Sequence, residues 1–266
     1  MDYKKIVFSK QQSVAKIVLS SAKNLNAIDA FMVDEIMAAL ETVASDPEVK
    51  VLVLAADGKG FSGGGDIRMM IDCVTKNLYD GLFEGVDKVG QLSLALKKLP
   101  IPVIASVHGP VAGAGFNVAL ACDFIVAAES ATFIQAFVKI GLIPDAGGIY
   151  LLNKAIGVSR ATELVMTGRP VDAKEAHSMG LVVDVVPDEQ LESATYQFAG
   201  RLAKGPGLSL RYMKELTFES DFKDFESYLA LEAKKQKLCG QTEDFKEGIM
   251  AFAEKRKPNF SMRGVV

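Results

Sequence analysis

The sequence predicts an α/β fold built as a spiral of repeated strand–strand–helix units, followed by a helical C-terminal region. Apolar, β-branched runs lead through glycine-rich turns into segments with helical apolar spacing. These strand–turn–helix units recur at roughly fifty-residue spacing, which indicates a spiral of related turns. Beyond residue 208 the pattern is helical and rich in lysine, with no strand signal.

Composition narrows the class of protein. The 266 residues are enough to bury a sizeable core, and 49% hydrophobic with 24% charged residues is typical of a soluble globular protein. A net charge of −3 gives no general attraction to nucleic acid or to an anionic membrane. Two histidines and three cysteines without metal-ligand spacing predict no metal site and a reducing, cytoplasmic compartment. We also expect no membrane partner, because no apolar run is long enough to span a bilayer.

The first units follow from hydrophobic period and turn residues. Residues 6–8 and 14–19 predict a hairpin, residues 28–44 a helix that begins near Asn26 or Asp29, and residues 49–55 a buried strand. Residues 72–98 predict a long helical stretch interrupted by Gly81, Gly85 and Gly90. A mobile lid and a kinked core helix both fit that stretch.

The later units repeat the pattern. Strands are predicted at 101–107, 124–128, 132–134 and 182–186, and helices at 118–122, 149–156, 158–167, 173–179 and 191–202. The sequence KGPG at 204–207 marks a boundary between a core at residues 1–204 and a helical region at 205–266.

Two glycine-rich turns carry the strongest chemical signal. Residues 61–67 read FSGGGDI after one predicted strand, and residues 108–117 read HGPVAGAGFN after another. Small residues let the backbone turn sharply, and N–H groups at a helix N-terminus favour negative charge. Such turns could stabilise charge on a bound oxygen. The alternative is a plain strand–turn–helix link with small residues for packing.

With these turns the chain resembles the crotonase (enoyl-CoA hydratase/isomerase) family, which has signature turns at both places. The resemblance extends from the loop at residues 23–27 to the C-terminal pattern TEDFKEGIMAFAEKRKPNF at 242–260. It implies the spiral of ββα units and a helical tail that packs between subunits, in trimers that often pair into hexamers. We expect that tail to expose the apolar residues Phe218, Phe222, Phe225, Tyr228 and Leu229.

The family match assigns the oxyanion-binding N–H groups to Gly63 in the first turn and Ala114 in the second, where many relatives have glycine. Two such donors would stabilise the enolate that forms when a proton leaves the carbon beside a thioester. One donor is typically worth about 3–4 kcal/mol of barrier.

The hydratases of this family use two glutamates, which align with Asn117 and Phe137 here. An amide and a phenyl ring cannot hold, deprotonate and replace the protons of an added water. The sequence therefore argues against ordinary hydratase activity.

One carboxylate, Asp145, remains near the expected pocket, in the segment IPDAGG at 143–148. Isomerases of the family resemble the chain there, and a single base suffices to move a double bond. The apolar neighbours Phe133, Phe137 and Ile143 would raise the pKa of this base. The alternative is that Asp145 caps the helix after it.

The substrate's carrier half is expected to meet residues that match the family's binding positions. The substrate-binding set is Lys23, Leu25, Ala27, Asp66, Ile67, Asn117, Phe137, Phe252 and Lys255. Lys255 would meet a phosphate as a point charge, or else lie solvated in a basic run. His108, His177 and Asp123 are interpreted as structural. No separate cofactor is expected, since coenzyme A or carrier-protein pantetheine enters as part of the substrate.

We therefore expect an acyl-thioester isomerase that shifts a Δ3/Δ2 double bond of an enoyl-CoA or enoyl-carrier-protein through a stabilised enolate. Alternatives are a ring-1,2-epoxyphenylacetyl-CoA isomerase, an enoyl-CoA hydratase, or a non-catalytic acyl-CoA-binding homologue. RNA binding, known for an occasional family member, lacks a basic surface at this net charge. The carrier, the acyl chain and the choice between trimer and hexamer stay open.

Overall fold

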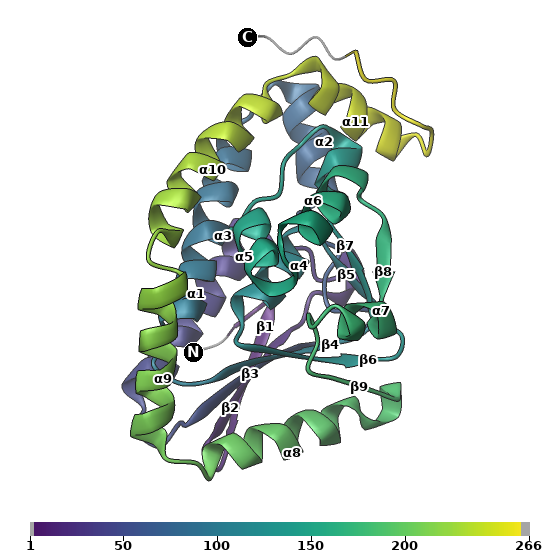
Figure 1. The fold of residues 1–266 in the computed structure, drawn as a ribbon. Coiled ribbons are helices and arrows are strands. Elements are labelled where there is room, and N and C mark those ends of the chain that lie inside the picture. The colour runs from purple at the N-terminus through teal and green to yellow at the C-terminus, as the bar shows by residue number, and fades with distance from the viewer. Residues whose placement is uncertain (1–2, 262–266) are drawn as a thin grey trace.

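The computed structural model describes residues 3–261, which form two sheets enclosed by helices (Figure 1). In the six-stranded sheet the order is β1 (Ile6–Gln11), β2 (Val14–Leu19), β3 (Val51–Ala56), β4 (Val103–Val107), β6 (Phe124–Ala128) and β9 (Asp184–Val186). The pair β1–β2 is antiparallel and the other neighbours are parallel. The three-stranded sheet has the order β5 (Pro110–Ala112), β7 (Thr132–Ile134) and β8 (Pro170–Asp172).

The helices follow the strands along the chain. They are α1 (Ala30–Ser45), α2 (Ile67–Lys76), α3 (Asp80–Lys98), α4 (Gly113–Ala121), α5 (Gly148–Ile156), α6 (Val158–Thr167), α7 (Ala173–Ser178), α8 (Leu191–Ala203), α9 (Gly207–Asp221), α10 (Phe225–Gly240) and α11 (Glu243–Ala253). Short 3-10 turns add η1 (Ala22–Asn24), η2 (Ala136–Ile140) and η3 (Asp188–Gln190). The predicted α/β class, with strand–turn–helix units followed by helices alone, is confirmed.

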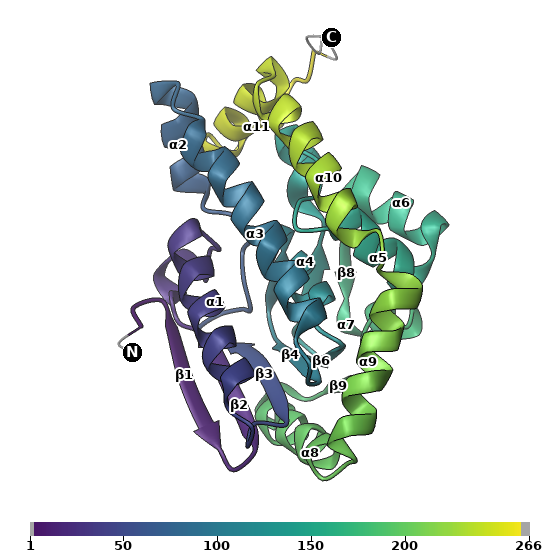
Figure 2. The same ribbon diagram turned by 90° about the vertical axis from the view of Figure 1, so that its left-hand side faces the viewer.

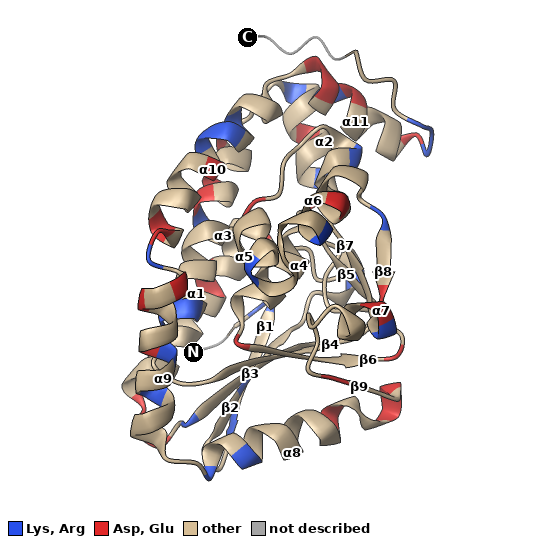
Figure 3. Cartoon of the chain, in the orientation of Figure 1, with Lys and Arg blue, Asp and Glu red and all other residues tan. Residues whose placement is uncertain are grey.

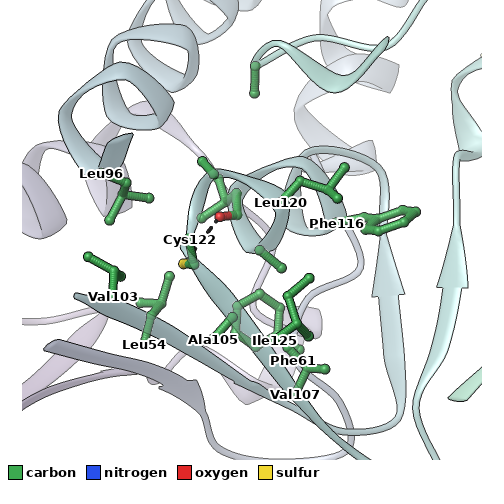
Figure 4. Packing of buried hydrophobic residues seen from close by; sticks show 14 of the residues in the cluster. Leu54, Phe61, Leu96, Val103, Ala105, Val107, Phe116, Leu120, Cys122 and Ile125 are labelled. Carbon is green, nitrogen blue, oxygen red and sulfur yellow. Dashed lines mark hydrogen bonds between the residues drawn. The ribbon is translucent and has the colours of Figure 1, made fainter. Parts of the chain in front are cut away.

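Alternate residues of a strand point to opposite faces of the sheet. Both faces of the large sheet carry apolar residues and are covered by helices. Figure 4 shows strand residues such as Leu54 and Ala105 beneath Leu120 of α4, within the main core. The intervening residues, including Val53 and Ile104, form a second cluster that packs against α8. The sheet is therefore packed on both faces. This packing fixes the ends of β3 and β4, and the two glycine turns follow these strands.

Some element boundaries differ from those predicted. The short strands β5 and β8 were not expected, since each begins with a proline that cannot donate a sheet hydrogen bond. The stretch predicted as one helix with glycine interruptions breaks instead at Asn77, whose φ is +58°. The three glycines lie inside the continuous helix α3, which packs against α1 and α10.

The C-terminal helices lie differently from the prediction. Phe225 and Leu229 are buried in the main core, and Phe218, Phe222 and Tyr228 are partly buried, so this expected exposed face is wrong. Other large apolar residues are exposed instead: Leu208, Tyr212, Met213 and Leu216 on α9, Leu231 and Leu238 on α10, and Phe252 on α11. Helix α10 packs along α3, and α11 packs against α2 and η2 (Figure 2). Part of α10 thus completes the core, whereas α9 has no buried residue and carries four exposed large apolar side chains.

No helix within residues 3–261 combines the length and the apolar composition needed to cross a bilayer. Lys and Arg are interspersed with Asp and Glu along α9, α10 and α11 (Figure 3).

Candidate active site

The two glycine turns lie side by side. The Ser62 N–H donates to the Pro110 carbonyl at 3.1 Å, and the Ala112 N–H donates to the Ser62 carbonyl at 2.9 Å. Gly64 has a φ of +95°, and a Cβ there would lie 3.0 Å from the Ala112 oxygen. The turns therefore approach more closely than a side chain at Gly64 would allow.

The N–H groups of the first turn are not equivalent. The Gly63 N–H donates to the Leu25 carbonyl at 2.8 Å, and the Gly64 N–H donates to Ser62 Oγ at 3.1 Å. The Gly65 N–H donates to no acceptor within residues 3–261. The assignment of an oxyanion donor to Gly63 thus conflicts with this geometry, because its proton already has an acceptor. Gly65 is the glycine of this turn that keeps a free donor.

Ala114 lies in the first turn of α4, where N–H groups have no partner inside the helix. Its preceding cap residue, Ala112, has no side chain that could accept a hydrogen bond. The Ala114 N–H donates to no acceptor in the described part of the chain. This helix terminus therefore keeps a free donor, beside the first turn, in a position that favours negative charge.

A cavity of about 130 Å³ opens beside the turns. It is lined by Gly63, Gly64, Gly65, Ile67, Met70, Leu82, Phe83, Val86, Gly113, Ala136, Phe137, Lys139, Ile140, Leu142, Asp145, Gln236 and Phe252. Most of these side chains are apolar, and Asp145 is the single carboxylate among these lining residues. No group of three or more His, Cys, Asp or Glu in residues 3–261 is arranged to hold a metal ion.

Asp145 lies between η2 and α5 with its side chain almost buried. Its Oδ1 has no hydrogen-bond partner within the described residues, and burial raises the pKa of the carboxyl to about 7. Helix α5 has Gly147 as its N-cap and no side-chain cap, so the predicted alternative of a capping Asp145 is wrong. Oδ1 of this carboxylate can therefore take a proton without breaking a hydrogen bond of the described structure.

The two positions where the hydratases carry glutamate have different surroundings. Asn117 is fully buried; its Nδ2 donates to the Asp145 carbonyl at 2.8 Å, and its Oδ1 accepts from Gln135 Nε2 at 2.8 Å. It does not line the cavity, so it supports the backbone of Asp145 rather than offering a group to a ligand. Phe137 does line the cavity, with its ring next to Gly113.

The other predicted binding residues divide into two groups. Ile67 and Phe252 line the cavity, and Leu25 packs against Gly63. Leu25 and four others do not line it: Lys23 and Lys255 are exposed, Ala27 is buried, and Asp66 caps α2 by accepting the Arg68 N–H at 2.9 Å.

The three residues interpreted as structural have backbone partners. His108 pairs with the Gly58 carbonyl and His177 with the Val182 carbonyl. Asp123 accepts from Lys214 Nζ at 2.7 Å and from a strand N–H. These contacts are consistent with a structural role, and none of the three residues lines the cavity.

Two buried polar residues of α10 were missed from the sequence. Glu232 is 5% exposed and Gln236 is 2% exposed, and burial raises the pKa of Glu232 to about 8. They continue the inward stripe of Phe225 and Leu229 at helical spacing. The sequence signal that could have identified them is their position, because a glutamate and a glutamine continue an apolar helix face that is otherwise expected to be buried.

The chain is similar to known proteins over nearly its whole length. A model of the family described as enoyl-CoA hydratase/isomerase matches residues 9–263. The chain is 40% identical to the trans-2-decenoyl-[acyl-carrier-protein] isomerase of Streptococcus mutans, over 98% of this chain and 99% of that protein. It is 37% identical to a probable enoyl-CoA hydratase of Rhodobacter capsulatus, over 99% and 100%. A crystal structure of an enoyl-CoA hydratase from Mycobacterium avium subsp. paratuberculosis superposes with a TM-score of 0.87, at 32% identity, and covers 98% of this chain and 100% of that chain.

Proposed function

The chain belongs to the enoyl-CoA hydratase/isomerase family, and from that premise we propose that it is an isomerase that shifts the double bond of an enoyl thioester. The observation that carries the proposal is one buried carboxylate, Asp145, in a mostly apolar cavity next to two turns that each keep a free N–H donor. A double-bond shift needs one base that removes a proton and returns it elsewhere on the same substrate.

In the proposed reaction Asp145 removes a proton from one of two carbons: the carbon next to the thioester carbonyl or the carbon two bonds further. The electron pair of the broken C–H bond passes into the conjugated system, and the thioester oxygen becomes an enolate. Asp145 then returns the same proton to the other carbon, so no atom is gained or lost. Its raised pKa makes the carboxylate a stronger base than an exposed aspartate.

The N–H groups of Gly65 and Ala114 are the proposed donors to the enolate oxygen. Both are free of intramolecular acceptors within residues 3–261, and they belong to turns that contact each other. Backbone donors held in place by a sheet and a helix need no reorganisation as the charge develops.

Hydration is the less favoured reaction. The buried Asn117 is held by two hydrogen bonds, and Phe137 offers a ring, so neither can activate a water. The test is to offer the purified protein 3-enoyl-CoA, 2-enoyl-CoA and the matching carrier-protein thioesters. We expect products of unchanged mass with altered ultraviolet conjugation. Products heavier by one water, without isomers, would overturn the proposal.

The proposed base predicts a pH dependence of the rate. Because the carboxylate is the active form and its pKa is raised to about 7, kcat should rise with pH through about 7 and level off above it. The measurement is the isomerisation rate from pH 5 to 9 at saturating substrate. A rate that is independent of pH over this range, or that falls through pH 7, would contradict Asp145 as the base.

Lys255 is the proposed contact for the phosphates of coenzyme A. Lys255→Ala should weaken binding of a coenzyme A thioester roughly tenfold, the value of one charge-assisted hydrogen bond, and leave the bare pantetheine thioester unaffected. Lys257→Ala, an exposed lysine two residues away, is the matched control. Equal effects of Lys255→Ala on the two substrates would remove the assignment.

The exposed apolar face of α9 motivates an assembly prediction. Leu208, Tyr212, Met213 and Leu216 are each more than half exposed and share one helix. We expect a trimer or a pair of trimers that covers them. Leu216→Glu should shift the mass measured by light scattering towards the monomer. A wild-type protein that is a stable monomer at micromolar concentration would refute the expectation.

A further inference from the structure

The backbone that carries Asp145 is held from the C-terminal helix α10. The Gly147 N–H donates to Glu232 Oε1 at 2.7 Å, and the Ile143 N–H donates to Gln236 Oε1 at 3.0 Å. Glu232 and Gln236 are one turn apart on α10, and Asp145 lies between the two anchored residues. The helix thus holds the segment 143–147 on both sides of the carboxylate.

The anchored segment has an unusual backbone. Ala146 has a φ of +53° and Gly147 has a φ of +78°, so two consecutive residues are left-handed. This conformation is unfavourable for alanine and needs support from the surroundings. A Cβ on Gly147 would lie 2.2 Å from the Phe225 ring of α10, which shows how closely the turn presses on that helix.

Burial of the Glu232 carboxyl group is energetically unfavourable. Glu232 is buried, its Oε2 has no hydrogen-bond partner within residues 3–261, and it does not line the cavity. Its raised pKa, about 8, means that the protonated form predominates at neutral pH. A neutral carboxyl group still accepts the Gly147 N–H through one oxygen, as a glutamine would.

We propose that Glu232 is a positioning residue, which accepts the Gly147 N–H and thereby holds the left-handed turn that directs Asp145 into the cavity. This inference rests on the proposed function of Asp145. Glu232 touches neither substrate nor cavity, so it acts through the geometry of the base. A small displacement of a reacting group can cost orders of magnitude in rate.

The test compares Glu232→Met, which keeps the size but loses the acceptor, with Glu232→Gln, which keeps both. We expect Glu232→Met to lower kcat for a 3-enoyl-CoA about tenfold or more, with KM changed less than about twofold. Glu232→Gln should restore most of the wild-type kcat. Lys234→Ala, on the exposed side of the same helix, is the control for general effects on α10. If Glu232→Met does not fold, Glu232→Ala replaces it, and the same loss of kcat is expected.

The outcomes separate the two ideas. A wild-type kcat in Glu232→Met, or an equal loss in Glu232→Gln and Glu232→Met, would overturn the positioning role. A Glu232→Gln protein that cannot fold would overturn it as well, because the acceptor is retained. Asp145→Asn is measured alongside: if it keeps the wild-type rate, the proposed function itself fails. If Asp145→Asn is inactive and Glu232→Met is fully active, only the positioning role fails.

Discussion

Asp145→Asn is expected to lower the rate of the double-bond shift at least ~10²-fold, the lower end of general acid–base contributions, with folding nearly intact. Asparagine has the size of aspartate but cannot take a proton from carbon. The folded state should lose little, because Asp145 Oδ1 has no hydrogen-bond partner within residues 3–261 and the residue does not cap α5. The measurement is the isomerisation rate with a 3-enoyl thioester, together with a thermal melt.

A matched control for this change is Asp184→Asn, which removes an exposed carboxylate of β9 far along the chain from the cavity segments. Its rate should equal that of the wild type. An Asp145→Asn protein that isomerises at the wild-type rate would refute the base assignment. Failure of Asp145→Asn to fold would instead indicate a structural role for the carboxylate.

Ala114→Pro is expected to lower kcat roughly 10²–10³-fold, the usual loss when one oxyanion donor is removed. Proline has no N–H, and the first turn of a helix tolerates it better than any later position. Position 114 lies in the first turn of α4, where the N–H has no intrahelical partner. The substitution thus removes the proposed donor and no hydrogen bond of the helix itself.

The control at this position is Ala114→Gly, which removes only the methyl group and keeps the N–H. It should retain a rate within a few-fold of the wild type. Circular dichroism and melting of both variants report whether α4 is intact. A folded Ala114→Pro protein with wild-type kcat would exclude this N–H from the reaction.

The sequence predicted those parts of the fold that depend on local signals. The strand β2 and the helix α6 have the predicted bounds, because period, caps and breakers are encoded within a few residues. Asp145 was identified differently, through the resemblance to the family: it is the one carboxylate near the expected pocket once Asn117 and Phe137 occupy the glutamate positions. The structure brings it into one cavity with the glycines of the first turn and Phe137.

The details that were missed depend on contacts between distant segments. The hydrogen bond from the Gly63 N–H to the Leu25 carbonyl joins two segments that are separated along the chain by α1 and β3. No local sequence pattern predicts such a contact. Asn117 was expected to contact the substrate because it aligns with a glutamate of the hydratases. The sequence does not reveal its hydrogen bonds to Gln135 and to the Asp145 carbonyl. The burial of Phe225 and Leu229 depends on how α10 packs on α3, which helical spacing alone does not specify.

The anchoring of the Asp145 segment by α10 also bears on how the protein acquires activity during synthesis. The two hydrogen bonds join residues 85 and 93 positions apart, from Gly147 to Glu232 and from Ile143 to Gln236. A nascent chain that has emerged as far as α8 already contains both glycine turns, Asp145 and the Asn117 contact to the Asp145 carbonyl, but not the two contacts from α10. Contacts of such long sequence separation form late in folding. We therefore expect the geometry of the proposed base to form only after α10 has been synthesised and has packed against the segment 143–147.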